Sequence, residues 1–326
     1  MASHVIDEIN RCLQCTKPAC RQGCPINTPI PQMISLLKEH RLNEAGELLF
    51  NNNPLSLMCS VICNHDRQCE GNCILGRKGS AVQISTIEHY ISDTCLDNMN
   101  ISCQPDNGIA VAVIGSGPAG LSAAVQLARL GYRVTIFDSK DRIGGVMQYG
   151  IPEFRLPKSI LERFKNKLLG MGIRIRLNTT IGNALRIDDL FRDDYRAVFI
   201  GTGVWRPRTL GVKGESRGNV LFGIDYLANP NQHELGQTVA IIGMGDTAMD
   251  VARTCLRHGA QQVTLYNRSS KIGASKAQQN YTRLDGAEFE FNKQIVEINE
   301  QGPLFRQLIV DEDGNVTGEL PEMLQA

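Results

Sequence analysis

The glycine-rich stretch at residues 111–124, VAVIGSGPAGLSAA, constrains the fold of this chain more than any other feature. Its first four residues are apolar, as in a short buried strand, and the small residues after the glycines are typical of a closely packed helix. The glycines have the GxGxxG spacing of a turn that brings backbone N–H groups against a pyrophosphate at a helix N-terminus. The residues of this predicted dinucleotide-binding loop are Gly115, Gly117, Pro118, Ala119 and Gly120.

A second predicted strand, Val134–Phe137, ends in Asp138, which lies 23 residues after Gly115. That spacing suits a carboxylate that accepts a hydrogen bond from a ribose hydroxyl in a βαβ unit. A βαβ turn without a ligand is the alternative interpretation of the same residues.

Composition places the chain in a broad class. Its 326 residues suggest two or three domains, and 42% hydrophobic residues suffice for real cores. The formal net charge is zero, which argues against a nucleic-acid partner or a polybasic membrane patch. No apolar run of about 18 residues and no signal peptide is evident, so we expect a cytoplasmic protein without a membrane partner.

The cysteines are concentrated near the N-terminus: eight of the 11 fall between Cys12 and Cys73. In a reducing compartment such groups hold metal more often than they form disulfides. A helical spacer is predicted over Pro31–Phe50, so the two cysteine groups must meet across it. Thiolates in such groups suit two 4Fe–4S clusters; zinc, and disulfides or free thiols, are the alternatives.

The order of the motifs in this region resembles the N-terminal domain of the glutamate synthase small (beta) subunit, which the NADPH-side half of dihydropyrimidine dehydrogenase shares. The motifs are CLQC-x4-C-x3-CP from Cys12, NP at Asn53, C-x5-C-x3-C from Cys63, and IxxIE from Ile84. The resemblance implies cross-ligation of two clusters. The implied ligands of the first cluster are Cys12, Cys15, Cys20 and Cys73, and those of the second are Cys24, Cys63, Cys69 and Glu88. It assigns no role to Cys59.

The same family resemblance extends through residues 142–158, where GG, YGIP and FRLPK are found. It implies that this segment lines a flavin, and therefore that the first nucleotide site binds FAD. A further buried strand is predicted over Ala197–Ile200, and the glycine turn after it is implied to lie near the FAD. The flavin-lining candidates beyond the first loop are Gly144, Gly145, Tyr149, Arg155, Gly201 and Gly203.

A second strand–glycine–helix pattern begins at Thr238, and its predicted second strand is Val263–Tyr266. Asn267 takes the place that Asp138 has in the first copy, and Arg268 follows it. A neutral residue followed by arginine suits a 2′-phosphate, which favours NADPH over NADH. The candidate residues of this site are Gly243, Gly245, Asp246, Thr247, Ala248, Asn267 and Arg268.

These patterns predict an α/β chain with three parts. We expect a helical two-cluster iron–sulfur domain over 1–105, an FAD-binding Rossmann-like domain over 106–233, and an NAD(P)-binding one over 234–326. Members of the family continue beyond this point, so we expect the last domain to be shortened and both nucleotide domains to be incomplete. A hairpin turn is predicted at residues 311–315.

The predicted function is that of an NAD(P)H-dependent oxidoreductase subunit. Electrons would pass from NAD(P)H through FAD and two 4Fe–4S clusters to a partner redox subunit, which would resemble the glutamate synthase large subunit or be another reductase subunit. Cofactor chemistry of this kind needs no general acid or nucleophile from the protein, so no catalytic residue is expected. The alternative is a non-catalytic iron–sulfur electron-transfer or docking module that lacks stable FAD.

Overall fold

A computed structural model describes residues 3–182 and 184–326. The helices are α1 (Ser3–Arg11), α2 (Ala19–Gln22), α3 (Ile30–Lys38), α4 (Leu42–Asn52), α5 (Ser56–Ile62), η1 (Ile74–Arg77), α6 (Ile84–Cys95), α7 (Pro118–Arg129), α8 (Val146–Tyr149), α9 (Lys158–Gly170), α10 (Ile187–Arg192), α11 (Gly223–Ala228), η2 (Pro230–Gln232), α12 (Asp246–Arg257) and α13 (Lys276–Leu284). The strands are β1 (Ala110–Ile114), β2 (Arg133–Phe137), β3 (Arg174–Arg176), β4 (Tyr195–Ile200), β5 (Thr238–Ile242), β6 (Gln262–Tyr266), β7 (Glu288–Glu290), β8 (Lys293–Ile298), β9 (Pro303–Val310) and β10 (Val316–Gln325).

The chain forms two compact units, Met1–Gln148 with Glu153–Gly203, and Tyr149–Pro152 with Val204–Ala326. Within the described residues, no helix combines the length and the apolar character needed to cross a membrane.

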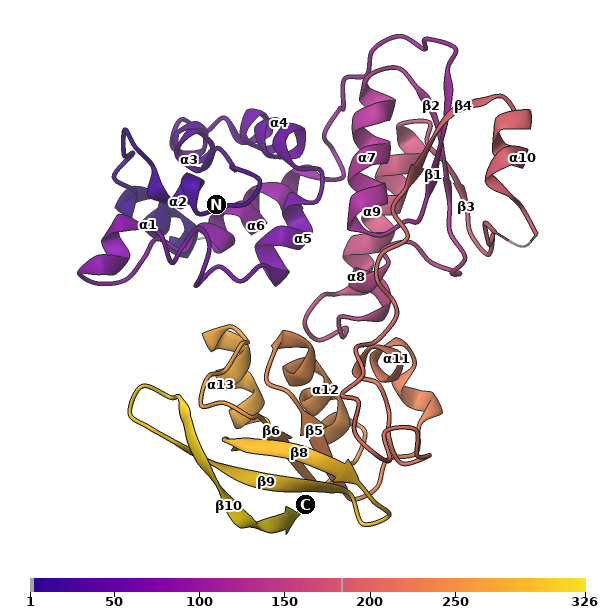
Figure 1. Cartoon of the computed structure of the whole chain (residues 1–326). Coiled ribbons are helices and arrows are strands. Elements are labelled where there is room, and N and C mark those ends of the chain that lie inside the picture. The colour runs from indigo at the N-terminus through magenta and orange to yellow at the C-terminus, as the bar shows by residue number, and fades with distance from the viewer. Residues whose placement is uncertain (1–2, 183) are drawn as a thin grey trace. The chain divides into compact units, whose positions relative to one another are not determined.

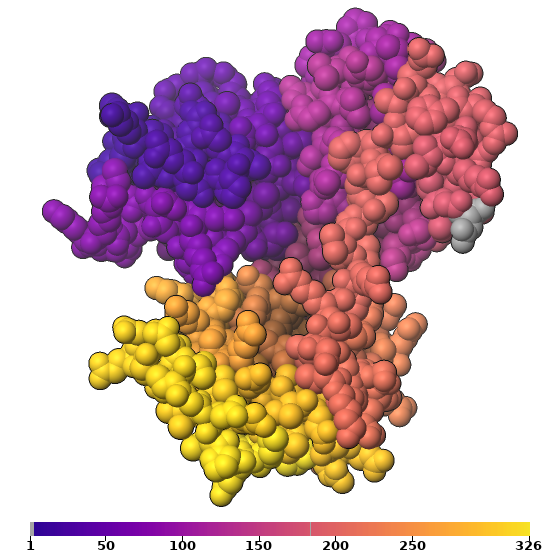
Figure 2. Space-filling view, in the orientation of Figure 1, coloured from indigo at the N-terminus to yellow at the C-terminus, as the bar shows by residue number. Residues whose placement is uncertain are grey.

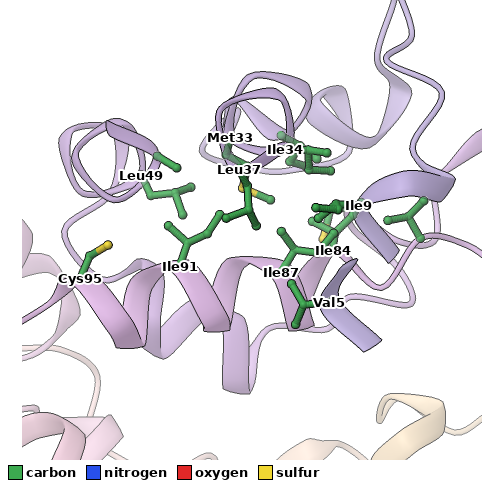
Figure 3. Packing of buried hydrophobic residues seen from close by; sticks show 14 residues of the cluster. Val5, Ile9, Met33, Ile34, Leu37, Leu49, Ile84, Ile87, Ile91 and Cys95 are labelled. Atoms are coloured by element: carbon green, nitrogen blue, oxygen red, sulfur yellow. The ribbon is translucent and has the colours of Figure 1, made fainter. Parts of the chain in front are cut away.

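The N-terminal region is a helical domain built on one apolar core (Figure 3). Helices α1, α3, α4 and α6 each turn one side toward this core, because their apolar residues recur at helical spacing. The labelled side chains of the core are Val5, Ile9, Met33, Ile34, Leu37, Leu49, Ile84, Ile87, Ile91 and Cys95. This core fixes the helices from whose ends and connections the cysteines project.

The predicted single helix over Pro31–Phe50 is wrong. The structure has two helices here, α3 and α4, separated at His40, whose φ of 60° is left-handed and ends the first helix. The break reverses the chain, so that Leu37 and Leu49 both enter the same core. Apolar spacing alone could not reveal this, because both helices carry an apolar side.

The first Rossmann-like domain, which is part of the first compact unit, contains a parallel sheet in the order β3-β2-β1-β4. Helices α7 and α9 cover one face, and α10 lies on the other (Figure 1). Leu190 of α10 packs against Ala112, Ile114 and Phe137 of the central strands. The sheet places the carboxyl ends of β1, β2 and β4 at one edge, where parallel α/β sheets bind ligands.

Strand β4 is present, but the prediction that it is buried is wrong. Phe199 is 38% exposed and Ile200 is 59% exposed. The reason lies in its place in the sheet: β4 pairs with β1 and is the last strand on that side among the described residues. An apolar edge strand can show the same sequence pattern as a central strand, so only the order of strands in the sheet reveals which of the two is exposed.

The second unit contains a parallel sheet in the order β5-β6-β7 and an antiparallel sheet in the order β10-β9-β8. Helix α12 packs through Met249, Ala252 and Cys255 against the parallel sheet. The predicted hairpin turn at 311–315 is confirmed: Asp311 N–H donates to the Asn315 carbonyl at 3.0 Å. The strand after this turn, β10, is largely exposed and lies at the surface (Figure 2).

Candidate functional site

The first group of cysteines surrounds one cavity in the helical domain. Cys12 follows α1, Cys15 lies in the next loop, Cys20 is on α2, and Cys73 precedes η1. All four line a cavity whose other walls are apolar, among them Ile34. Burial raises the pKa of the Cys20 thiol to about 11, and the charges of Cys73, Cys12 and Cys15 add to the effect. Four sulfurs around one apolar cavity fit a 4Fe–4S cluster.

The second group gathers the remaining predicted ligands. Burial raises the pKa of Cys69 to about 12, and the charges of Glu70, Glu88 and, more weakly, Cys24 act in the same direction. Glu88 and Cys69 also lie close enough to Cys63 to raise the pKa of its thiol. The structure therefore brings Cys24, Cys63, Cys69 and Glu88 to one place, as the resemblance implies.

Glu88 is buried in the helical domain, which is unusual for a glutamate: it is only 6% exposed. It projects from α6 among core residues, and burial raises its pKa to about 8, with smaller contributions from the charges of Cys59 and Glu70. A carboxylate that is buried beside thiols has the position of a cluster ligand or of a close neighbour of one.

Cys59, which the resemblance leaves without a role, also belongs to this second group. Its thiol hydrogen-bonds with that of Cys63, and its Sγ accepts from Asn53 Nδ2 at 3.2 Å. The hydrogen bond from Cys63 is the main cause that lowers the pKa of Cys59 to about 7; burial opposes it and Asn53 assists it. The sequence signal was the spacing of four residues at a helix end, which places two side chains on one side.

The described residues contain no set of three or more His, Cys, Asp or Glu side chains spaced for a single metal ion. Ligands of a 4Fe–4S cluster bind separate irons, so they surround a cavity instead of converging on a point. The cavity between Cys12, Cys15, Cys20 and Cys73 has that form.

Two glycines of the first nucleotide loop are required by the protein itself. Gly115 has a φ of +99°, and a Cβ there would lie 2.4 Å from the Gly201 carbonyl oxygen. A Cβ on Gly120 would lie 1.8 Å from the Gly115 carbonyl oxygen. The turn after β1 therefore lies so close to the turn after β4 and to the start of α7 that neither position has room for a side chain.

Gly117 is different, because nothing in the protein requires a glycine there. Its backbone is extended, with φ −73° and ψ −178°, and a Cβ would meet nothing closer than the Gly145 Cα at 3.9 Å. The open space lies at the N-terminus of α7, whose first residues are Pro118 and Ala119. A pyrophosphate needs space close to the backbone at a helix N-terminus, so the loop fits a dinucleotide.

Asp138 lies at the end of β2, at the edge of the sheet where the loop also lies. Its Oδ2 accepts from the N–H and Oγ of Ser116 at 2.6 and 2.5 Å, and its Oδ1 accepts from Lys140 N–H at 2.9 Å. The carboxylate therefore holds the glycine loop in place. A carboxylate has about four acceptor positions, so it keeps capacity for a ribose hydroxyl.

The segment after Asp138 closes over this loop. Gly144 N–H donates to the Ser116 carbonyl at 2.9 Å, and Gly145, with a φ of +54°, lies directly against Gly117. Further along, Arg155 Nη2 donates to the Ile62 carbonyl at 3.4 Å, one residue before Cys63. Arg155 thus links the predicted flavin-lining segment to the second cysteine group.

Two aromatic side chains near the predicted flavin-lining segment contact each other. Tyr149 and Trp205 meet edge to face, with ring centroids 6.4 Å apart. This contact gives the Trp205 ring a packing partner. Gly203, which follows β4 by three residues, has a left-handed φ of +76°.

The second nucleotide loop has the same open form. Gly243 turns with a φ of +115° after β5, and Gly245 is extended at the start of α12, with φ −90° and ψ 177°. A Cβ on either would meet nothing within 4 Å. Ala248 takes the third glycine position and is buried, while Asp246 Oδ1 accepts from Ser275 N–H at 3.1 Å. Thr247 lies between them in the first turn.

The residues predicted to recognise the ribose of the second nucleotide follow β6. Asn267 Nδ2 donates to the Lys271 carbonyl at 2.7 Å and to Ser269 Oγ at 3.1 Å, so its amide shapes this loop. Arg268 is exposed at the same loop. The guanidinium is therefore free of the core and can reach a phosphate.

Comparison with known proteins follows the same division. Residues 1–100 match the family described as dihydropyrimidine dehydrogenase domain II, 4Fe-4S cluster, and residues 109–320 match pyridine nucleotide-disulphide oxidoreductase. The glutamate synthase (NADPH) small chain of Escherichia coli K12 is 37% identical over 316 residues, which cover 90% of this chain and 67% of that protein. The small chain of Azospirillum brasilense is 37% identical, and the match covers 87% of this chain and 63% of that protein. The chain thus spans about two thirds of these relatives.

A solved complex of 2-naphthoyl-CoA reductase shares the fold, with a TM-score of 0.58 and 19% identity over 90% of this chain and 41% of that one. The comparisons confirm the predicted fold class: an iron–sulfur domain followed by a Rossmann-like pyridine nucleotide oxidoreductase fold. They also confirm the resemblance on which the cysteine assignments depend. The chain belongs to the family of the glutamate synthase small chain, and it is an oxidoreductase with an iron–sulfur and a pyridine nucleotide-binding part.

Proposed function

We propose that this chain takes electrons from NADPH and passes them through FAD and two 4Fe–4S clusters to a partner redox subunit. One observation carries the proposal: the two cysteine groups exchange members in space. Cys73, from the second group in the sequence, lies with Cys12 and Cys20, whereas Cys24 from the first group lies with Cys69. Exchange of the last cysteine is the pattern of two-cluster proteins.

The first cluster would be held by Cys12, Cys15, Cys20 and Cys73, which line one cavity. The second would be held by Cys24, Cys63 and Cys69, with a fourth ligand from the same site, where the resemblance points to Glu88. When bound, the flavin supplies the conversion of the two electrons of one hydride into single-electron transfers.

The chain's own residues bind and orient these groups. The loop at Gly117 would receive the FAD pyrophosphate, and Asp138 keeps that loop in place through Ser116. The loop at Gly245 would receive NADPH, with Arg268 near the 2′-phosphate. No residue needs to transfer a proton, because the protein positions the cofactors and tunes their potentials.

The electron acceptor would be a second protein subunit. The relatives from Escherichia coli and Azospirillum brasilense are named small chains of glutamate synthase, a name that implies a larger chain beside them. A partner that resembles that larger chain is the first candidate.

The test is anaerobic purification, assay of bound flavin, iron and sulfide, and titration with NADPH. We expect flavin, about eight irons per chain, and bleaching of both chromophores by NADPH. Cys20→Ser should remove the first cluster and leave the second. Clusters without flavin and without bleaching would support the non-catalytic electron-transfer module instead. Zinc in place of iron would contradict both functions.

A further inference from the structure

The two chain segments that build the first cysteine cavity contain no acidic residue. One segment lies between Glu8 and Glu39, and the other lies between Glu70 and Glu88. Both segments carry basic residues, although the chain as a whole has a formal net charge of zero. The basic residues are Arg11, Lys17, Arg21, Lys38, Arg77 and Lys78. The positive charge is therefore a local property of this part of the helical domain.

Four of these cations lie beside the walls of the cavity. Lys17 and Arg21 flank residues 18–20, all of which line the cavity. Arg77 ends η1, whose first two residues also line the cavity, and Lys78 follows Arg77 directly. The four cations come from both segments and surround a single cavity.

These four cations keep their charge available to the solvent. Lys17, Arg77 and Lys78 are exposed, and Arg21 Nε donates to the neutral Asn27 Oδ1 at 2.9 Å. Across residues 3–182 and 184–326, no acidic side chain forms an ion pair with any of the four. The positive charge is thus not neutralised by the fold.

Two apolar side chains stand between the same cavity and the solvent. Leu13 and Ile74 line the cavity, yet they are 60% and 40% exposed. A cluster in this cavity would lie one layer of side chains from the surface. Exposed apolar residues inside a polar rim have the composition of a protein–protein interface.

The cations have an alternative interpretation. A cluster with thiolate ligands is negatively charged, and nearby cations change its reduction potential. This interpretation accounts for the positive charge, but it does not account for two exposed apolar side chains over the cavity. The combination of an apolar centre and an unpaired cationic rim favours contact with another protein.

We propose that this surface docks a redox protein whose own redox centre is surrounded by acidic residues. The surface, called the cationic face below, consists of Leu13, Lys17, Arg21, Ile74, Arg77 and Lys78. Opposite charges around the two redox centres accelerate the encounter and orient the partner. One electron then leaves the reduced first cluster and reduces the centre of the partner, with no bond made or broken. The inference rests on the two-cluster function proposed above and adds the docking site and the charge of the partner.

The test uses the full chain with its cofactors, purified without oxygen and reduced with a stoichiometric amount of dithionite. Two haem proteins serve as electron acceptors: cytochrome b5, which is acidic, and cytochrome c, which is basic. Stopped-flow absorbance gives the second-order rate constant of haem reduction in about 0.01 M and about 1 M salt, where the screening length is about 30 Å and about 3 Å. Surface plasmon resonance on immobilised cytochrome b5 measures binding without electron transfer.

Lys17→Glu and Arg77→Glu each reverse one charge of the cationic face. Arg174→Glu is the matched control, because Arg174 is an exposed cation on β3 of the Rossmann-like domain and its reversal changes the net charge equally. Iron content shows that each variant retains both clusters.

We expect the unaltered chain to reduce cytochrome b5 at least about tenfold faster in low salt than in high salt. Lys17→Glu and Arg77→Glu should each remove most of this enhancement, weaken binding to cytochrome b5, and accelerate the reduction of cytochrome c. Arg174→Glu should behave as the unaltered chain does. Opposite effects on the two acceptors are the signature of docking, because a changed cluster potential alters the driving force for both in the same direction.

Two results would overturn the proposal. In the first, both variants of the cationic face change the rates with the two haem proteins in the same direction, so that the cations act on the cluster potential. In the second, Arg174→Glu has the same effect as Lys17→Glu, so that net charge alone is the cause. A chain that shows the expected salt dependence, but whose clusters NADPH does not bleach, would support the docking surface and contradict the proposed function.

Discussion

Arg163 Nη1 on α9 lies 2.5 Å from Asp93 Oδ1 on α6, and this pair joins the helical domain to the first Rossmann-like domain. The same guanidinium donates to the Asp93 carbonyl at 2.8 Å and to the two carboxylate oxygens of Asp97 at 3.2 and 3.0 Å. Lys167, one helical turn further, donates to the carbonyls of Asp97 and Met99 at 3.1 and 2.9 Å. The two domains therefore meet through a network of charged hydrogen bonds.

Arg163→Ala should weaken this junction. The side chain is 30% exposed, so solvent screens part of the interaction, and we expect the free energy of unfolding to fall by about 1–2 kcal/mol. Urea unfolding followed by circular dichroism measures the change. Arg192→Ala is the control, since Arg192 pairs with Asp189 but is 76% exposed and should contribute almost nothing. Equal effects of the two variants would contradict a structural role for the junction.

Gly117→Val should remove the flavin and leave the fold intact. The Cβ of the new side chain would enter open space at Gly117, so the clash would be with the ligand and not with the protein. We expect flavin affinity to fall at least about tenfold, or about 1.4 kcal/mol, with the melting temperature of the flavin-free protein unchanged.

Gly115→Val is the informative comparison with that variant. A Cβ at Gly115 would lie 2.4 Å from a backbone oxygen and would force a β-branched residue to a φ of +99°. We therefore expect it to unfold the domain. If Gly117→Val retains stoichiometric flavin, the loop is not the pyrophosphate site.

Arg268→Ala should weaken NADPH binding more than NADH binding, because a charged hydrogen bond to the 2′-phosphate is lost only with NADPH. Loss of such a bond corresponds to about 1.5–3 kcal/mol, or a KM for NADPH raised by about tenfold or more. Steady-state reduction of ferricyanide with each nucleotide gives the comparison. Lys213→Ala removes another exposed cation of the same unit, one that pairs with Glu297 at 3.3 Å, and should change neither KM. Equal losses for both nucleotides would place phosphate recognition elsewhere.

Asp285 gives the second unit a defined pH dependence. Burial raises the pKa of its carboxyl, but hydrogen bonds from Arg257 and Arg253 outweigh burial, and the net pKa lies below the ordinary value of 3.8. A carboxyl with a lowered folded-state pKa stabilises the fold above its unfolded pKa, and this contribution disappears as the pH falls through the folded value.

Asp285→Asn should therefore destabilise the protein at pH 7 by about 1 kcal/mol and make little difference near pH 3. Melting temperatures of both proteins across this range test it. Glu300→Gln serves as the control, because Glu300 is 84% exposed and lies 3.9 Å from Arg217. A difference that is the same at both pH values would show that the charge of Asp285 is not the cause.

The local units of this protein follow from the sequence alone. The two strand–glycine–helix motifs at Gly115 and Gly243 form as predicted, because a strand, its turn and its helix are adjacent in the chain and each residue's role follows from its neighbours. The family resemblance also implied which cysteines would gather, including the distant partnership of Cys73 with Cys20.

Tertiary structure alone decided what depends on packing between distant segments. The chain reversal at His40, the exposure of Ile200 on an edge strand and the junction at Arg163 all follow from which element lies beside which. The same holds for Cys59. The resemblance gives it no role, and only the fold brings its Sγ within 3.2 Å of Asn53 Nδ2. Apolar periodicity shows that a residue is covered, but contacts between segments far apart in the chain determine what covers it.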